Sequence, residues 1–210
     1  MENKEIFYHG SACCFDKFSL SYLGTGEGKS KFGHGIYITS SKETAEHYAI
    51  KALERLCHPY HPKGLSKRFI NHLGLGGYCY IYTVEVPQLT DDNHIFSSRP
   101  VNEAIIQRAE KKVGETLPEE AKSAGKYFRK YLGNLLIGNR TTVKKMISKA
   151  DAEAESAAAK FLDSIGVVFL VWPHSQNKPD GDTNRAVLNE NNIKIIDVME
   201  IIVNKIFVEK

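Results

Sequence analysis

The sequence predicts an α+β fold, in one domain that covers residues 1–210. Strand-forming runs lie towards the two ends of the chain, and helix-forming runs fill its middle third. A chain of 210 residues is long enough for one domain with a large insertion. We therefore expect two small, mainly antiparallel sheets that pack together, helices on their outer faces, and a helical insertion at about residues 100–165.

Two short strands are predicted within the first forty residues. β-forming residues run from Glu5 to His9 and end at a polar turn that begins with Gly10. A second strand covers residues 35–39 and follows a glycine-rich loop at residues 24–28. Glycines around the second strand allow its backbone to approach another group closely.

A helix is predicted over about residues 42–56. Ser40 and Glu43 form a capping box, and apolar residues recur at helical spacing after them. The same spacing places Tyr48 on the inward face of this helix.

The middle of the chain predicts one central strand and then three helices. Residues 78–86 are the most strand-like run of the sequence, rich in aromatic and β-branched residues. Helical spacing then covers residues 102–112, 118–136 and 150–165, and Gly166 ends the last helix. We interpret these helices as an insertion between parts of the sheet.

The last part of the chain returns to strand-forming residues. An apolar strand at residues 167–172 is followed by a polar loop at 174–184 and a strand at 185–188. After a turn at 189–191, a long β-like run covers residues 193–208. This pattern completes the sheets that the first half begins.

Composition indicates a water-soluble globular protein, with 42% hydrophobic and 25% charged residues. No run approaches the ~20 apolar residues of a membrane span, so we expect a cytoplasmic protein where the chain is made. A toxin delivered into a target cell without a signal sequence would look the same. The net charge of +3 gives little support for nucleic-acid binding. We interpret four lysines as a solvated helix face: Lys144, Lys145, Lys149 and Lys160.

Cysteine and histidine positions predict no metal site. The four cysteines have neither zinc-ligand spacing nor the density of a disulfide scaffold, so we expect reduced and mostly buried thiols. His58 and His61 have no carboxylate or cysteine pair at ligand spacing.

Three motifs carry a resemblance to a known family. Tyr8-His9-Gly10-Ser11, the run at residues 32–39 and the run at 45–49 together resemble the H-Y-E branch of ADP-ribosyltransferases, which includes the poly(ADP-ribose) polymerases and diphtheria-like toxins. The chain more closely resembles ADP-ribosyltransferase modules of phage and mobile-element polyvalent proteins. That resemblance includes the glycines at residues 26–28 and the strand at 78–86, and it extends to residues 161–172, 184–189 and 193–194.

The resemblance implies a mono-ADP-ribosyltransferase with NAD as co-substrate. It implies an acceptor that is a protein or a nucleic acid, and a bacterial toxin, effector or phage-conflict protein with an antitoxin or immunity protein as partner. The alternative is a catalytically silent module that binds NAD or a partner.

The predicted NAD pocket combines the two N-terminal motifs. Nicotinamide is a flat ring with a carboxamide, so it needs aromatic faces and hydrogen bonds at its edge. Tyr37 and Tyr48 supply the faces, the Gly10 backbone can approach the carboxamide, and the Ser11 hydroxyl adds a bond. The resemblance implies that His9 binds a ribose hydroxyl.

The third catalytic position departs from the family pattern. The resemblance places Asn184 where the polymerases have a glutamate, and an amide carries no charge and cannot accept a proton as a general base. Three interpretations stay open: Asn184 orients the ribose, Asp182 or Glu190 reaches the sugar, or the domain is inactive. An asparagine is consistent with mono-ADP-ribosylation rather than chain elongation. The expected catalytic residues are His9, Tyr37 and Asn184.

Overall fold

The structure, a computed structural model, describes residues 4–23, 31–57, 77–175 and 178–203. Side chains are described for these residues except at 54–57, 174–175 and 178–182. The α+β class is confirmed, whereas the two separate sheets are not, because the strands form one seven-stranded sheet in the order β4-β5-β6-β2-β1-β3-β7. The strands are β1 (Lys4–Ser11), β2 (Ile36–Thr39), β3 (Gly77–Pro87), β4 (His94–Phe96), β5 (Phe169–Ser175), β6 (Lys178–Val187) and β7 (Lys194–Val203).

The helices fall into two groups along the chain. Among the described residues, one long helix follows β2, and the other α-helices lie between β4 and β5. None of the helices in the described residues is both long enough and apolar enough to cross a membrane. The helices are α1 (Lys42–Cys57), α3 (Glu103–Val113), α4 (Glu119–Lys122), α5 (Gly125–Leu136), α6 (Val143–Ser148) and α7 (Ala152–Asp163), with short 3-10 helices η1 (Leu20–Tyr22) and η2 (Glu190–Asn192).

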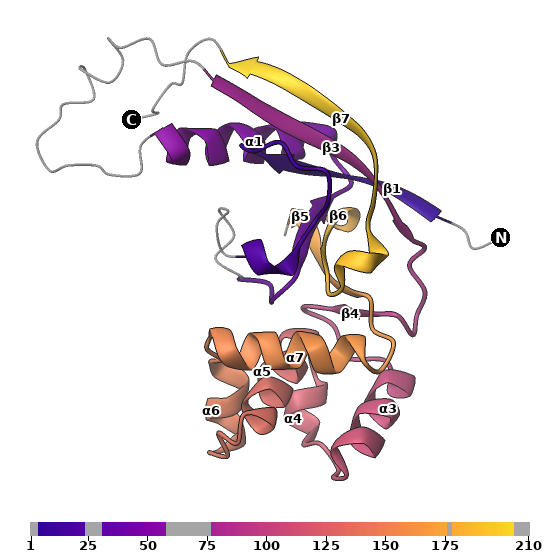
Figure 1. The fold of residues 1–210 in the computed structure, drawn as a ribbon. Helices are drawn as coiled ribbons and strands as arrows, with labels where there is room; N and C mark the ends of the chain where they lie inside the picture. The colour runs from indigo at the N-terminus through magenta and orange to yellow at the C-terminus, as the bar shows by residue number, and fades with distance from the viewer. Residues whose placement is uncertain (1–3, 24–30, 58–76, 176–177, 204–210) are drawn as a thin grey trace, which may run out of the picture.

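The sheet consists of two parts that are joined at one residue pair. β1 pairs with β3 along its whole length, but it pairs with β2 only through Tyr8 and Thr39. Strands β7, β3 and β1 form one part, and β2, β6, β5 and β4 form the other (Figure 1). The prediction of two sheets was wrong because this single pair makes the ladder continuous.

Different elements cover the two parts of the sheet. α1 packs on β1 and β3 through a small cluster that includes Ala49, Leu53 and Cys79. The helical segment of residues 103–163 packs on β5 and β6 around Phe128 and Leu132. Figure 1 shows α1 beside the upper part of the sheet and α3 to α7 gathered beneath the lower part. The region where β1 and β2 separate lies between these two groups of helices.

Helix boundaries differ from the predictions where backbone contacts override side-chain spacing. The predicted helix at 118–136 is divided between α4 and α5, because Ala124 adopts an extended backbone. Gly125 then passes so close to β4 that an added Cβ would lie 2.5 Å from the carbonyl oxygen of Phe96. The short helix α6 was not predicted. α3 and α7 begin and end within two residues of their predicted bounds.

Two further corrections concern polar residues. The predicted polar loop at 174–184 is largely strand, because β5 and β6 extend to Ser175 and Lys178 and pair with each other. The cap of α1 is Ser41 rather than Ser40, since the Ser41 hydroxyl oxygen accepts a hydrogen bond from the backbone N–H of Thr44 at 3.1 Å.

Some predicted features lie outside the described residues, and the described cysteines differ from expectation. The glycine-rich loop at 24–28, the histidines 58 and 61, and residues 204–208 of the last β-like run are not described. Of the described cysteines, Cys13 and Cys14 are exposed and only Cys79 is buried, so the thiols are not mostly buried. No group of three metal-binding side chains occurs among the described residues.

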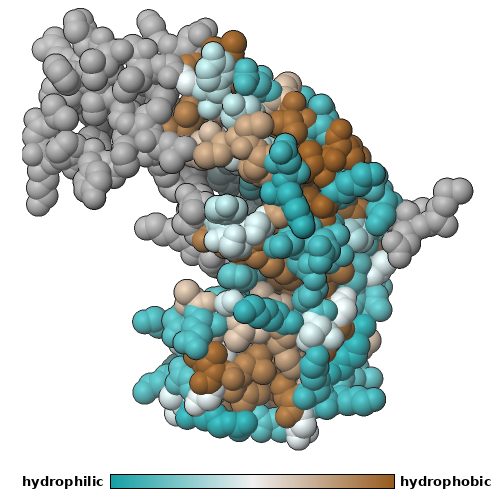
Figure 2. Space-filling view, in the orientation of Figure 1, coloured by the Kyte–Doolittle hydropathy of each residue, from teal (hydrophilic) through white to brown (hydrophobic). Residues whose placement is uncertain are grey.

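β7 forms one edge of the sheet and carries exposed apolar side chains. Ile196, Val198 and Ile202 are among them, and Figure 2 shows apolar residues gathered over this strand. Asp197 and Glu200 lie among these residues on the strand. Charged residues on an edge strand oppose pairing with other chains.

Candidate functional site

His9 occupies the position where β1 and β2 separate. The strands share no residue pair beyond Tyr8 and Thr39. Beyond this pair, the His9 side chain contacts the β2 backbone: its Nδ1 lies 2.7 Å from the carbonyl oxygen of Tyr37. A carbonyl oxygen can only accept, so Nδ1 carries the proton and donates it. The neutral ring therefore keeps Nε2 as an acceptor, and Nε2 has no hydrogen-bond partner among the described residues.

Aromatic rings surround the His9 imidazole on one face of the sheet. The ring centroid of Phe18 lies 5.1 Å from that of His9, and those of Tyr82 and Phe15 lie 6.2 and 6.3 Å away. Burial lowers the pKa of His9 below its ordinary value, and the hydrogen bond to Tyr37 opposes this only in part. The imidazole is therefore neutral at neutral pH.

The pH dependence of stability is expected to report this neutral histidine. As pH falls below ~6.5, the unfolded chain takes up a proton on His9 before the folded chain does, so the free energy of unfolding decreases. Urea unfolding at pH 7.5 and 5.5 measures this decrease. His9→Gln is expected to show a smaller decrease than the wild type. An identical decrease in both proteins would contradict the neutral assignment.

Gly10 lies directly under α1. A Cβ at this position would be 1.9 Å from the carbonyl oxygen of Ala45 and 2.7 Å from the backbone nitrogen of Ala49. The space that the sequence interpretation gave to the nicotinamide carboxamide is therefore filled by the helix backbone. Close packing of α1 on β1 is by itself sufficient to require glycine here.

Gly10→Ala is expected to lower the free energy of unfolding by about 3 kcal/mol, because α1 must move away from β1. Chemical denaturation measures the change. Gly114→Ala is a suitable control: its φ is 79° but nothing lies within 4 Å of the added Cβ, so only backbone strain of about 1 kcal/mol is expected. Equal effects at the two sites would contradict the packing account.

Tyr37 is fixed by the turn that precedes its strand. Its hydroxyl donates to the carbonyl oxygen of Gly33 at 3.0 Å and accepts from the backbone N–H of Phe32 at 2.9 Å. Its ring lies 5.0 Å from that of Trp172, on which Phe32 stacks at 4.3 Å. Burial raises the pKa of Tyr37, against the opposing effects of the Phe32 hydrogen bond and the Arg129 charge. Tyr37 is thus held as a rigid, neutral aromatic surface.

Asn184 belongs to a row of residues that crosses four strands. Tyr8 on β1 pairs with Thr39 on β2, Thr39 pairs with Asn184 on β6, and Asn184 pairs with Trp172 on β5. Directly paired residues of antiparallel strands lie on the same face of a sheet. Tyr37, two residues before Thr39, shares this face.

The Asn184 side chain has no hydrogen-bond partner among the described residues. The residue is 8% exposed, but its amide atoms are not among the fully buried side-chain atoms that lack a partner, so water can reach them. A ligand hydroxyl at this position could exchange hydrogen bonds with the amide donor and acceptor.

The other predicted site residues are less closely associated. The Ser11 hydroxyl oxygen accepts a hydrogen bond from the Cys13 N–H at 3.0 Å. Tyr48 is 45% exposed, so its inward placement was wrong: Ala45 and Ala49 occupy the inward face of α1. The described ring contact of Tyr48 is with its neighbour His47.

The two alternatives to Asn184 differ in their surroundings. The Glu190 carboxylate accepts a hydrogen bond from the backbone N–H of Leu20 at 2.7 Å, and so it holds η1 against η2. It lies six residues beyond Asn184, past the end of β6. Asp182 belongs to β6, but its side chain lies outside the described residues.

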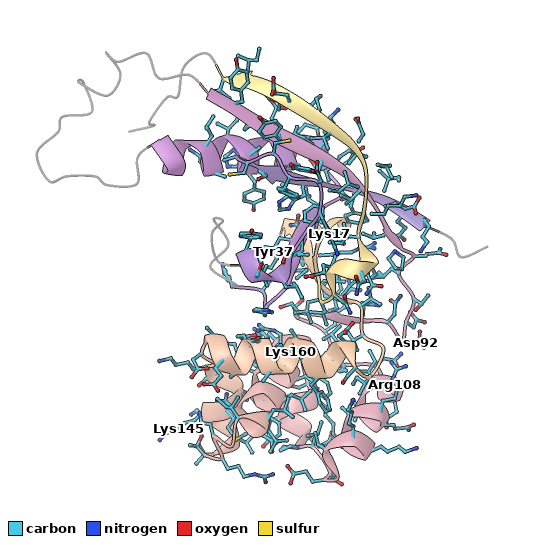
Figure 3. The ribbon with its side chains drawn as sticks, viewed as in Figure 1. Lys17, Tyr37, Asp92, Arg108, Lys145 and Lys160 are labelled. Atoms are coloured by element: carbon cyan, nitrogen blue, oxygen red, sulfur yellow. The ribbon has the colours of Figure 1, made fainter. Side chains whose placement is uncertain are left out.

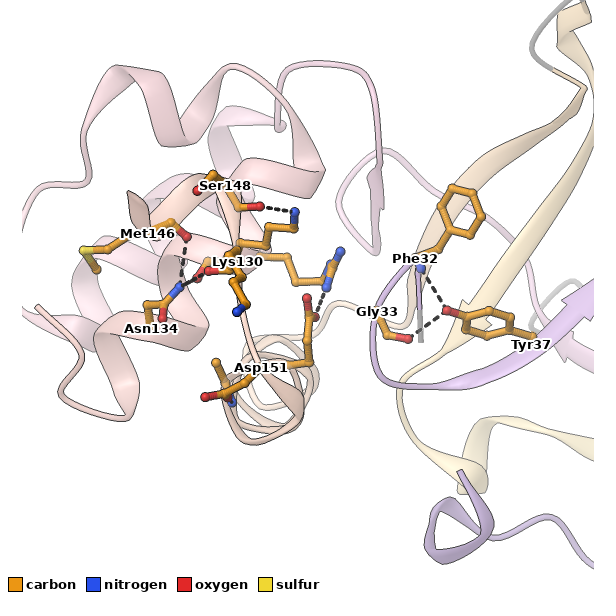
Figure 4. A network of polar contacts seen from close by, with 12 residues as sticks. Phe32, Gly33, Tyr37, Lys130, Asn134, Met146, Ser148 and Asp151 are labelled. Atoms are coloured by element: carbon orange, nitrogen blue, oxygen red, sulfur yellow. Dashed lines mark hydrogen bonds and ion pairs between the residues drawn. The ribbon is translucent and has the colours of Figure 1, made fainter. Parts of the chain in front are cut away.

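A buried ion pair supports the Tyr37 turn from the helical side. Arg129 on α5 pairs with Glu155 on α7, and burial lowers the pKa of Arg129 to about 10. A Cβ at Gly33, whose φ is 117°, would lie 3.0 Å from the Arg129 side chain. Figure 4 shows the Phe32-Gly33-Tyr37 turn with the hydrogen bonds of the Tyr37 hydroxyl. Neither residue of the ion pair was predicted from the sequence.

The structure therefore brings some predicted residues together and not others. His9 contacts the backbone of Tyr37, and Tyr37 shares a sheet face with Asn184, while His9 lies on the opposite face at the separation of the strands. Two surface depressions, of about 620 and 220 Å³, are lined by other residues. Thr39 and Trp172 were not predicted as site residues. Alternation along a strand places them on the face of Asn184 only when the pairing of the distant strands is known.

Comparison with protein-family models, curated proteins and solved structures finds no match. The ADP-ribosyltransferase interpretation therefore depends on the motif residues and on the geometry around His9, Tyr37 and Asn184.

Proposed function

We propose that this chain is an NAD-dependent mono-ADP-ribosyltransferase that modifies a macromolecular acceptor, and that NAD binds where β1 and β2 separate. The main support comes from two features near this position, on opposite faces of the sheet. His9 presents an unpartnered acceptor nitrogen, and its other nitrogen is fixed on the Tyr37 backbone. Asn184, a residue only 8% exposed, has an amide with no hydrogen-bond partner among the described residues.

The chemistry of these groups fits the ribose part of NAD as substrate. His9 and Asn184 lie on opposite faces of the sheet, so each would bind a different ribose of NAD. A hydroxyl of the adenosine ribose can donate to His9 Nε2, and a hydroxyl of the nicotinamide ribose can exchange hydrogen bonds with the Asn184 amide. Tyr37 and Trp172 provide rigid aromatic surface on the face of Asn184. Gly10 adds no support, because the packing of α1 already explains it.

In the proposed reaction, the bond between ribose C1′ and nicotinamide breaks, and nicotinamide leaves with the electron pair. Positive charge develops on the sugar, as in glycoside hydrolysis. The acceptor nucleophile then bonds to C1′, and its proton passes to solvent. Asn184 cannot take that proton, so its role is to orient the ribose. Asp182 remains the alternative acid or base, whereas Glu190 is engaged with Leu20.

The biological setting follows from the resemblance alone. We infer a bacterial toxin, effector or phage-conflict protein, which would require an antitoxin or immunity protein in the cell that makes it. We also infer that the protein acts in the cytoplasm.

Incubation with labelled NAD and cell extract tests the proposal. The expected result is release of nicotinamide and transfer of label to a macromolecule, with the label removed by protease or by nuclease according to the acceptor. No label in any macromolecule together with no loss of NAD would overturn the enzyme proposal and favour the silent binding module.

A further inference from the structure

The helical segment contains a long run without acidic residues. No Asp or Glu occurs between Glu120 and Asp151, although the whole chain is nearly balanced, with 28 basic and 25 acidic residues. The run covers the end of α4 and all of α5 and α6. Its basic residues are Lys122, Lys126, Arg129, Lys130, Arg140, Lys144, Lys145 and Lys149.

Three of these cations are neutralised by carboxylates from outside the run. Lys122 pairs with Glu110 and Glu119, Arg129 with Glu155, and Arg140 with Glu115. The other five form no ion pair with a described residue. We name these five the lysine face: Lys126, Lys130, Lys144, Lys145 and Lys149.

The lysine face is continuous across α5 and α6. Lys126 and Lys130 are one turn apart on α5, with about 6 Å between their Cβ atoms. Lys144 and Lys145 lie on α6, and Lys149 is its C-cap residue. The Nζ of Lys130 donates to the carbonyl oxygen of Ser148 at 2.8 Å, which joins the two helices (Figure 4).

The positive charges of this surface repel one another. The pKa of Lys130 is lowered first by burial and then by the charges of Arg129 and Lys126. An anion bound along the surface would relieve this repulsion.

The positive surface extends towards the proposed NAD site. Lys160 on α7 is exposed, and its charge, after burial, contributes to the lowered pKa of His34. His34 follows Gly33 in the turn that holds Tyr37. In the view of Figure 3, Lys160 lies between Lys145 on α6 and Tyr37 on β2.

We propose that the lysine face binds the phosphate backbone of a nucleic acid. The exposed residues within 141–149 are lysine, serine and threonine, which are typical phosphate contacts. Protein interfaces usually have an apolar centre, and the side chains of Val143, Met146 and Ile147 on α6 are buried or half-buried instead. We further infer that the acceptor of ADP-ribose is the bound nucleic acid, and this second step rests on the proposed function.

Binding without NAD tests the first step. Fluorescence anisotropy with labelled 12-nucleotide single-stranded RNA, single-stranded DNA and duplex DNA is measured between 50 and 200 mM NaCl. Affinity is expected to fall with salt, by about 0.7 logarithmic units per contacted phosphate for each tenfold rise in salt concentration for single strands. The variant Lys144→Gln/Lys145→Gln/Lys149→Gln is expected to bind roughly tenfold more weakly and to show a reduced salt slope.

The control variant Lys17→Gln/Lys111→Gln/Lys194→Gln removes the same charge elsewhere, from exposed positions, and is expected to bind like the wild type. Equal binding by both variants would overturn the proposal. So would equally tight binding of the wild type to polyglutamate or to anionic vesicles.

The acceptor is tested separately with labelled NAD. Nuclease-sensitive label that decreases in the α6 lysine variant, with nicotinamide release retained, is expected. Protease-sensitive label would overturn the nucleic-acid acceptor but not the proposed transferase. Nucleic-acid binding without any NAD turnover would overturn the transferase, and with it the acceptor, but not the docking surface.

Discussion

Replacement of Glu155 by alanine is expected to lower the free energy of unfolding by about 3–5 kcal/mol. Arg129 is only 3% exposed and has Glu155 as its ion-pair partner. Without that carboxylate, the guanidinium charge remains buried and unpaired between α5 and α7. The loss is expected to appear as a lower denaturant midpoint with an unchanged slope.

The double variant Arg129→Met/Glu155→Leu is the matched control for this prediction. It removes both charges and fills the same space with apolar atoms, so most of the stability is expected to return. If Glu155→Ala lowers the free energy of unfolding by less than about 1 kcal/mol, the ion pair is solvated. The pair would then not stabilise the turn that holds Tyr37.

Asn184→Ala is expected to reduce kcat for nicotinamide release by about 10²–10³-fold, comparable to the loss of one positioned donor in an active site. The amide is proposed to orient the ribose while charge develops at C1′, so KM for NAD is expected to change much less. Steady-state kinetics of nicotinamide release measures both constants.

Two neighbouring variants distinguish the possible third catalytic residues. Glu190→Ala is expected to keep kcat near the wild-type value, because its carboxylate holds the Leu20 backbone instead. Asp182→Ala is expected to do the same. Loss of kcat in Asp182→Ala with normal turnover in Asn184→Ala would assign the role to Asp182.

Local patterns predicted the helices well because helical spacing is contained within one segment. The bounds of α1, α3 and α7 lie within about two residues of those predicted. Tyr48 was misplaced because two alanines at helical spacing, Ala45 and Ala49, pack more closely against β1 than a tyrosine can.

Features that depend on pairing between distant segments were not predictable. The row that reaches Trp172 depends on the register of β2 and β6, which lie more than a hundred residues apart in sequence. The Tyr8–Thr39 pair that joins the sheet also depends on the register of two separate strands. The strands at 167–172 and 185–188 were predicted, but the parts of β5 and β6 within residues 174–184 were predicted as a loop because these residues are polar.

The lysine face illustrates the same limit on the surface. Lys144, Lys145 and Lys149 were interpreted as a solvated helix face, and α6 itself was not predicted. Only the packing of α6 beside α5 places these lysines next to Lys130. The sequence does contain a signal that was not used in the prediction: no carboxylate occurs around these lysines.

Calorimetric titration of NAD into the wild type and into His9→Ala tests the central claim most directly. Saturable binding by the wild type is predicted, with affinity at least about tenfold weaker in the variant, which is ~1.4 kcal/mol of binding free energy. Circular dichroism confirms that both proteins are folded. No binding to the folded wild type, or equal affinity in the two proteins, would contradict an NAD site at the separation of β1 and β2.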